Sequence, residues 1–198
     1  MRRLAVLAAW VGLAALEVLV ARTYVGFGTW WHWLLHQQVG WGVGLATAAL
    51  VATVSRWRPP AVVALLGGQL ASILPDLQFR FARMPHEPSM DVWLGHISLH
   101  TGPSPVLVAL GALLLGGWAY VAVTLRRRRV AVPLALGALV LVLVACLLAR
   151  PLPTTLADHP ADSAPVALFS GDNPGISAYA RQHTGEEVVR LLEYSSDE

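Results

Sequence analysis

Five long runs of mainly apolar residues dominate this sequence and constrain its fold more than any other feature. They cover residues 4–21, 28–54, 61–74, 105–125 and 130–149. A helix that crosses a bilayer needs about 20 mostly apolar residues. The chain is also 56% hydrophobic and only 13% charged, whereas a typical soluble domain is about 25% charged. We therefore predict an all-α fold: a polytopic membrane helix bundle with about five transmembrane helices.

The first and third apolar runs are less typical of spanning helices than the others. The run over 4–21 follows Arg2 and Arg3, as a signal peptide would, but it is long enough to span and no small-residue cleavage site follows it. We interpret it as the first transmembrane helix. The third run is short for a span, and Pro75 is expected to break it. It reaches a spanning length only if the helix continues past Pro75 to Phe79.

Charge divides the chain into two parts. Residues 1–150 hold twelve arginines and four acidic residues, whereas residues 151–198 hold two arginines and eight acidic residues. We predict a transmembrane helical domain over 1–150 and an acidic extracytoplasmic tail over 151–198. The tail begins with a proline-rich, extended segment, and a capping-box pattern at Thr184–Glu187 predicts a short amphipathic helix over 184–194. The arginines cluster at the ends of the apolar runs, so no nucleic-acid partner is expected.

The arginines also predict an orientation in the membrane. Cytoplasmic loops are enriched in Lys and Arg, and the richest arginine groups, at 2–3, 56–58 and 126–129, would lie on one face of a five-helix bundle. All 14 basic residues are arginine, which suggests GC-rich bacterial coding. We predict a multi-pass protein of the bacterial plasma (inner) membrane, with a cytoplasmic N-terminus and an extracytoplasmic C-terminus. Membrane lipids are then its immediate partners.

Ionisable residues are concentrated in the stretch 67–104, between two apolar runs. It holds three of the seven histidines and three of the twelve acidic residues: Asp76, His86, Glu87, Asp91, His96 and His100. His32 and His36 fall on the same side of the predicted membrane, and their spacing puts them on one helical face. Ionisable residues at a membrane edge are functional candidates by default.

Imidazole and carboxylate groups are suitable ligands for a divalent metal ion such as zinc, with bonds of about 2.0–2.2 Å. We predict one shared site made by His36, Asp76, His96 and His100, with His32 and His86 as further ligands. The His96-x3-His100 spacing predicts two imidazoles on one helical face, which is a common way to chelate one ion. Asp91 or Glu87 is the candidate general base, because a spare carboxylate can accept a proton from activated water.

The same residues also allow simpler, structural interpretations. A single histidine at a membrane edge is more often a hydrogen-bonded interfacial residue than a ligand. The tryptophans near the second run are typical of an interfacial belt: Trp30, Trp31, Trp33 and Trp41. Glu17, within the first run, either reaches the headgroups or faces the bundle as a proton or metal partner. The lone Cys146 can form no internal disulfide and is expected to pack among apolar neighbours.

Three short motifs resemble those of the YdjM-like predicted membrane-bound metal-dependent hydrolases of bacteria. That family has a His-x3-Gly at an early span, a Leu-Pro-Asp-x-Asp at the end of a later span, and a His-Arg-Gly-x-Thr-His-Ser-like element entering the next. The corresponding stretches here are His36–Gly40, Leu74–Gln78 and Gly95–Thr101. The likeness covers residues 32–125 and implies a metal site and a hydrolase.

The chain departs from that pattern at two points. Gln78 stands where the family has its second Asp, so one anionic ligand is missing. The two late histidines are four residues apart instead of five, and the Arg-Gly between them is absent. Asp91 or His86 would then have to replace the lost ligand, or the site is altered.

The sequence is compatible with three functions. The first is a membrane-bound, metal-dependent hydrolase with an outward-facing His/Asp site, acting on a lipid or envelope ester or phosphoester. The second is a non-enzymatic membrane protein, either metal-binding or accessory, with structural histidines. The third is a haem-binding protein, which would need two axial histidines on facing spans. The clustering of the histidines at one edge argues against the third.

Overall fold

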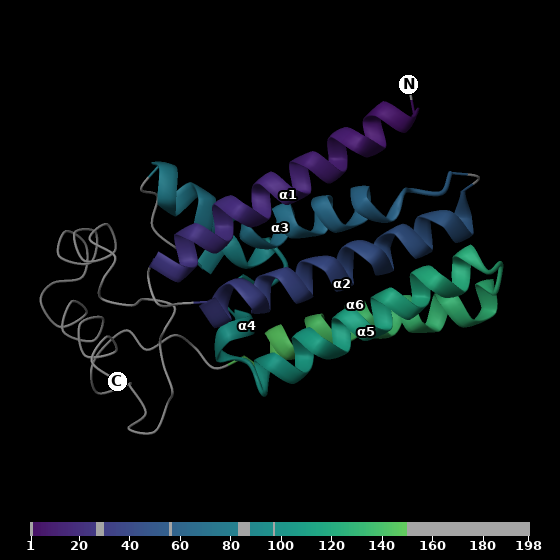
Figure 1. The fold of residues 1–198 in the computed structure, drawn as a ribbon. Coiled ribbons are helices and arrows are strands. Elements are labelled where there is room, and N and C mark those ends of the chain that lie inside the picture. The colour runs from purple at the N-terminus through teal and green to yellow at the C-terminus, as the bar shows by residue number, and fades with distance from the viewer. Residues whose placement is uncertain (1, 27–29, 56, 83–87, 97, 150–198) are drawn as a thin grey trace, which may run out of the picture.

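The computed structural model describes residues 2–26, 30–55, 57–82, 88–96 and 98–149 (Figure 1). Throughout these residues all regular secondary structure is helical, so the predicted all-α fold is confirmed. The helices, in chain order, are α1 (Arg2–Gly26), α2 (Trp30–Val54), α3 (Ala61–Ala82), the 3-10 helix η1 (Pro88–Val92), α4 (Ser98–Thr101), α5 (Pro105–Thr124) and α6 (Arg128–Leu147). The predicted acidic tail, with its 184–194 helix, lies outside the described residues.

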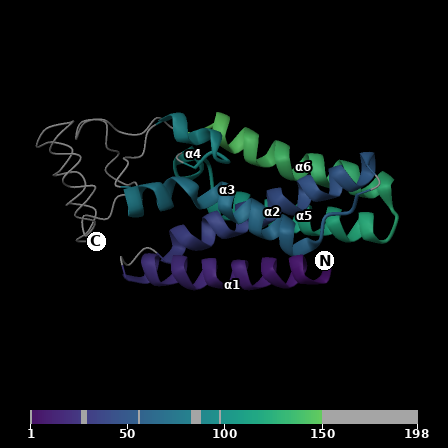
Figure 2. The same cartoon turned by 90° about the horizontal axis from the view of Figure 1, so that it is seen from above.

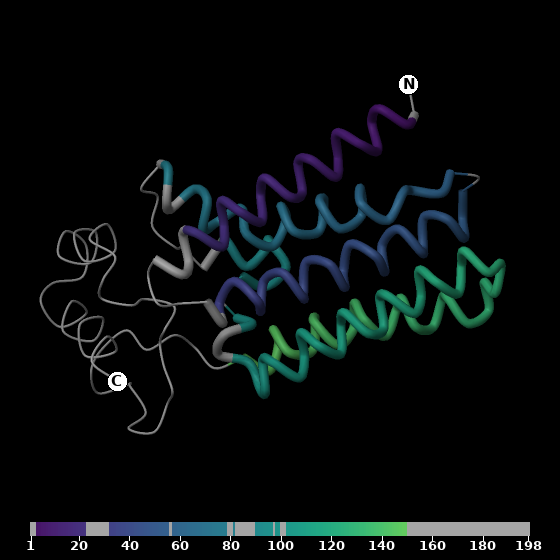
Figure 3. Tube along the Cα trace, in the orientation of Figure 1, coloured from purple at the N-terminus to yellow at the C-terminus, as the bar shows by residue number. Residues whose placement is uncertain are grey.

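The five long helices run side by side as an up-and-down bundle, and α2 is its central member (Figures 1 and 3). Helix α2 packs against α3, α5 and α6, whereas α1 packs mainly against α3 and α2. Seen from above, α1 and α6 lie at opposite edges (Figure 2). Because successive helices alternate in direction, the start of α2, the end of α3 and the short helix α4 meet at one end.

Four of the helices are long and apolar enough to cross a membrane: Arg3–Arg22, Ala61–Gln78, Pro105–Thr124 and Arg128–Leu147. Large apolar side chains on them face outward, including Val11, Leu114, Trp118 and Leu143. This is the arrangement of a membrane protein, whose outer surface contacts lipid tails. Helix α2, whose first turns carry histidine and glutamine, is not among these four. It lies between the other helices, so the fifth span stays a prediction.

Helix α3 does not break at Pro75, as the sequence predicted; it continues to Ala82 with the proline inside it. Proline lacks an N–H, so the carbonyl of Ala71 loses its partner in the helix. A proline in a helix interior costs about 3 kcal/mol or more, and the packing of this turn offsets that cost, since Ile73 and Pro75 are fully buried. The continued helix has spanning length, and it carries Asp76 in the turn that follows the proline.

Glycines let α2 approach both of its neighbours closely. A Cβ added to Gly68 of α3 would lie 1.9 Å from the carbonyl oxygen of Gly40 on α2, and one added to Gly44 would lie 2.1 Å from that of Ala64. On the other side of α2, a Cβ on Gly116 of α5 would lie 2.0 Å from the carbonyl oxygen of Gly42. Small residues of this kind are typical of interfaces between membrane helices.

Buried alanines continue this close packing toward the other end of the bundle. They come from α2, α5 and α6 and include Ala46, Ala49, Ala119, Ala135 and Ala138. Nearer the α4 end the core contains larger side chains, such as Leu35, Leu99 and Val142. Cys146 packs against that second group, in agreement with its predicted apolar role.

We expect the α5–α6 connection to lie in the cytoplasm. Reporter enzymes inserted after Arg127 and fused after Glu198 should report cytoplasm and exterior respectively, because the arginines at 126–129 favour retention on the inner side. A cytoplasmic signal from the C-terminal fusion would show that the predicted orientation is inverted, or that α2 does not cross the membrane.

Candidate metal centre

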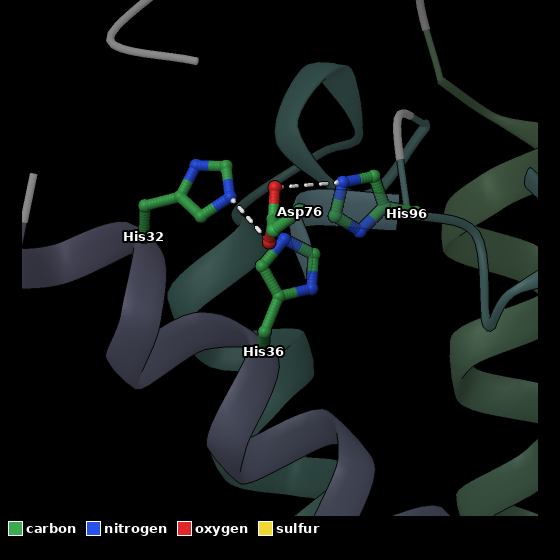
Figure 4. A group of neighbouring side chains, drawn as sticks. All are labelled: His32, His36, Asp76 and His96. Carbon is green, nitrogen blue, oxygen red and sulfur yellow. Dashed lines mark hydrogen bonds and ion pairs between the residues drawn. The ribbon is translucent and has the colours of Figure 1, made fainter. Parts of the chain in front are cut away.

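Four polar side chains meet at the end of the bundle where α2 begins (Figure 4). His32 and His36 come from the first two turns of α2, Asp76 from α3, and His96 from the turn that precedes α4. Each offers one ligand atom, and these atoms all lie within 4.8 Å of one another. The group can therefore hold a metal ion. The four residues come from three segments that are distant in the sequence.

Asp76 lies at the middle of the group and contacts two imidazoles. Its Oδ1 is 3.2 Å from Nε2 of His96, and its Oδ2 is 3.4 Å from Nε2 of His32. Ligand atoms bonded at about 2.0–2.1 Å to a tetrahedral ion lie about 3.3 Å apart. Both distances match that spacing. The ligand atoms of the whole group lie within 4.8 Å of one another, so the widest pair has to close by up to roughly 1.5 Å to reach the tetrahedral spacing.

The imidazole rings are packed against one another. The ring centres of His36 and His96 are 4.3 Å apart and nearly parallel, with 17° between their planes. His32 lies 4.6 Å from His36, one helical turn away on α2. The side chains of His32, His36 and His96 are almost completely buried, whereas the Asp76 side chain is 14% exposed. Among the four, Asp76 is thus the residue that solvent can reach.

Ser72 determines which nitrogen of His36 carries a proton. Its hydroxyl donates to the backbone carbonyl of His36 at 2.7 Å, so its single proton is used. Nδ1 of His36 lies 3.2 Å from the same hydroxyl oxygen and therefore has to donate to it. This makes Nε2 the unprotonated nitrogen of His36. Fixing the tautomer of a ligand in this way is a common feature of metal sites.

His96 is oriented by the same turn of α3. Its Nδ1 donates to the backbone carbonyl of Ser72 at 3.0 Å, which directs Nε2 toward Asp76. Burial by itself lowers the pKa of His96, but the charge of Asp76, the hydrogen bonds to Asp76 and Ser72, and the charge of Asp91 together raise it above the ordinary value. A proton therefore competes with a metal ion for Nε2.

The turn that presents His96 depends on Gly95. Leu94 and Gly95 both have positive φ, 58° and 70°, a region that favours glycine. A Cβ on Gly95 would also lie 2.1 Å from Sγ of Cys146 on α6. The carboxylate of Asp91 accepts hydrogen bonds from the backbone N–H of Ser98, at 2.8 Å, and from the Ser98 hydroxyl. These contacts hold the chain between η1 and α4.

Helix α4 does not carry both His96 and His100, which corrects the sequence prediction. It begins only at Ser98, and His96 lies in the turn before it. His100 lies in α4, but its side chain is outside the described part of the structure, as are His86 and Glu87. Their predicted roles stay predictions.

The structure changes the roles assigned to three other residues. His32, which the sequence suggested only as a further ligand, is a full member of the group. Asp91, a candidate base, binds Ser98 and acts on His96 through its charge. Ser72 was missed altogether. Its signal in the sequence was its position one turn before Asp76, which places both side chains on one face of α3.

Comparisons with known proteins identify no relative: no family model, no curated protein and no solved structure matches the chain. The fold and the site define the class of the protein: it is a helical membrane protein with a buried His/Asp cluster that can hold a metal ion.

Proposed function

We propose that this chain is a membrane-embedded, metal-dependent hydrolase whose centre is formed by His32, His36, Asp76 and His96. The observation that supports this is the convergence of three imidazoles and one carboxylate at distances suited to a single ion. Nitrogen and oxygen ligands in this number favour zinc among the divalent ions. A divalent ion held here supplies Lewis-acid activation of water and of an ester or phosphoester group.

The chain's own residues then divide into two roles. His32, His36 and His96 are the proposed ligands, and Ser72 positions two of them through its hydroxyl and carbonyl. Asp76 is the proposed general base, because it is the most exposed of the four and touches the ligand atoms of two histidines. Three protein ligands are typical of catalytic zinc sites, which keep one position open.

The position of the group in the bundle suggests the substrate class. His32 and His36 lie at the start of α2, and His96 lies in the segment between α3 and α5. The group is thus at the end of the candidate spans, where lipid headgroups would lie. We propose a lipid or envelope precursor that carries an ester or phosphoester at this depth.

A second function is favoured by one specific observation. If Asp76 is a fourth ligand, the set is complete and closed, which is typical of structural zinc sites. The near-complete burial of the three histidines also fits such a site. The chain would then be a metal-binding or accessory membrane protein without hydrolytic activity.

The Asp76→Asn variant separates the two functions. For the hydrolase, we expect purified wild-type protein with zinc to cleave chromogenic esters or phosphoesters, and Asp76→Asn to keep its zinc but lose about 10²–10⁴-fold in rate, the usual contribution of a general base. Metal content and hydrolysis are measured on the same samples.

The Gln78→Asn variant is the matched control, because it also changes a side chain at the end of α3 but lies outside the cluster. It should keep both zinc and activity. If zinc-loaded wild type cleaves nothing and Asp76→Asn releases the ion, the hydrolase proposal is wrong and the closed structural site is correct.

A further inference from the structure

A second group of buried polar atoms lies outside the His/Asp cluster, on α1, α2 and α3. They are Oε1 of Glu17, Nε1 of Trp41, and both amide atoms of Gln69, and none has a hydrogen-bond partner within the described residues. Gln69 is fully buried. An unsatisfied buried polar group costs about 1–3 kcal/mol. Three such side chains in one membrane bundle therefore need a common explanation.

Helix contacts place the three side chains at one level of the bundle. Gly12 faces Leu66, and Val20 packs against Ile73, so Glu17 lies opposite the turn of α3 between those two points, where Gln69 is found. A Cβ added to Gly40 would lie 3.0 Å from Cα of Gln69, and Trp41 is the next residue of α2. The helix register thus places the three residues at one level of α1, α2 and α3.

Glu17 is anchored through only one of its two oxygens. Its Oε2 accepts hydrogen bonds from Nε1 of Trp33, at 3.0 Å, and from Nε2 of Gln37, at 2.9 Å. Glu17 therefore faces the bundle, as one of the two interpretations of the sequence expected, and its role as a proton or metal partner stays a prediction. The other oxygen, Oε1, needs a donor if the carboxyl is ionised and an acceptor if it is protonated.

The unsatisfied atoms define the ligand that would complete them. The indole N–H of Trp41 and the NH₂ of Gln69 need an acceptor, whereas the carbonyl oxygen of Gln69 needs a donor. A metal cation cannot accept a hydrogen bond, and a simple anion cannot donate one. A hydroxyl group does both: its oxygen accepts from the N–H groups of Trp41 and Gln69, and its proton is donated to one oxygen, that of Gln69 or Oε1 of Glu17. Water has a second proton and can donate to both oxygens.

We propose that Glu17, Trp41 and Gln69 form a binding site for a hydroxyl-bearing ligand between α1, α2 and α3. Water is one source of that hydroxyl, and the alcohol group of a lipid is the other. The ligand bridges α1, the least enclosed helix, to the two helices that carry most of the metal centre. The site does not depend on the proposed hydrolase, because none of its residues belongs to the His/Asp cluster.

The test is nuclear magnetic resonance on the full chain in detergent micelles, with ¹⁵N-labelled tryptophan and Trp41 assigned by Trp41→Phe. We expect a cross-peak from the Trp41 indole proton to water, or to glycerol protons of co-purified lipid. A water cross-peak that survives delipidation identifies water, and a glycerol cross-peak lost on delipidation identifies the lipid alcohol. The absence of both from wild-type protein would falsify the proposal.

Substitution of Gln69 by Leu then tests the site itself. Gln69→Leu should lose the cross-peak, because the ligand loses two of its partners, whereas Gln78→Leu, the same change nine residues further along α3, should keep it. A cross-peak unchanged in Gln69→Leu would overturn the assignment of Gln69. An experimental structure in which the Gln69 amide bonds directly to Trp41 or Glu17 would also overturn the site.

Discussion

Replacing Gly68 by Ala will destabilise the bundle strongly and disassemble the metal centre. The added Cβ would lie 1.9 Å from the carbonyl oxygen of Gly40 and 3.0 Å from Cα of Gly44. Both contacts are with backbone, which cannot rotate away as a side chain can, so α2 and α3 have to separate. Overpacking in a core costs about 1–3 kcal/mol, and a clash with backbone lies at the upper end. His36 and Asp76 lie on the two helices that separate.

Gly67→Ala is the matched control for this substitution. Gly67 is the neighbouring residue of the same helix, and nothing lies within 4 Å of a Cβ placed there. Alanine gains up to about 1 kcal/mol over glycine in a helix interior at either position, so the difference between the two variants isolates packing. Thermal unfolding in detergent and bound zinc are the measurements. Equal melting temperatures for the two variants would show that α2 and α3 are not in close contact.

The same comparison is available on the other side of α2. Gly116 faces the carbonyl oxygen of Gly42, whereas a Cβ on Gly117 meets nothing within 4 Å. Gly116→Ala should therefore lower the melting temperature and Gly117→Ala should not. Because α5 carries none of the four clustered residues, Gly116→Ala should affect zinc binding less than Gly68→Ala does.

Removal of His36 will lower zinc affinity more than any change outside the cluster. Nε2 of His36 is the nitrogen that the Ser72 hydrogen bond leaves unprotonated, and the ring lies against His96. Loss of a residue that only orients a ligand typically costs about 10–100-fold in metal affinity, so we expect that loss for Ser72→Ala and a larger one for His36→Ala. Competition with a chelator on purified protein measures both.

His159→Ala, in the predicted tail, is the control and should bind zinc as wild type does. His100→Ala, measured alongside, tests the ligand role that the sequence predicted for His100. Because Asp76 raises the pKa of His96, zinc affinity should be greatest above that raised pKa and fall as the pH decreases through it. Equal affinities for His36→Ala and His159→Ala would exclude the cluster as the metal centre.

Local patterns in the sequence were sufficient to predict the helical class and the positions of the five long helices, but not the continuation of α3 past Pro75. A run of about 20 apolar residues between arginines predicts a spanning helix with little reference to the rest of the chain, because a backbone in lipid has to satisfy its own hydrogen bonds. The same local rule put His32 and His36 on one face of α2. It also made Asp76 and His96 candidates, since ionisable residues are costly beside apolar runs.

The tertiary structure alone decided which of these groups meet. His32 and Asp76 are 44 residues apart, His36 and Ser72 are 36 apart, and Ser72 and His96 are 24 apart. Their contacts depend on how closely α2 approaches α3, which the glycines at 40, 44 and 68 permit. They depend also on the turn at Gly95, which directly precedes His96. Helical spacing is a property of neighbouring residues, whereas these contacts arise from packing between distant segments.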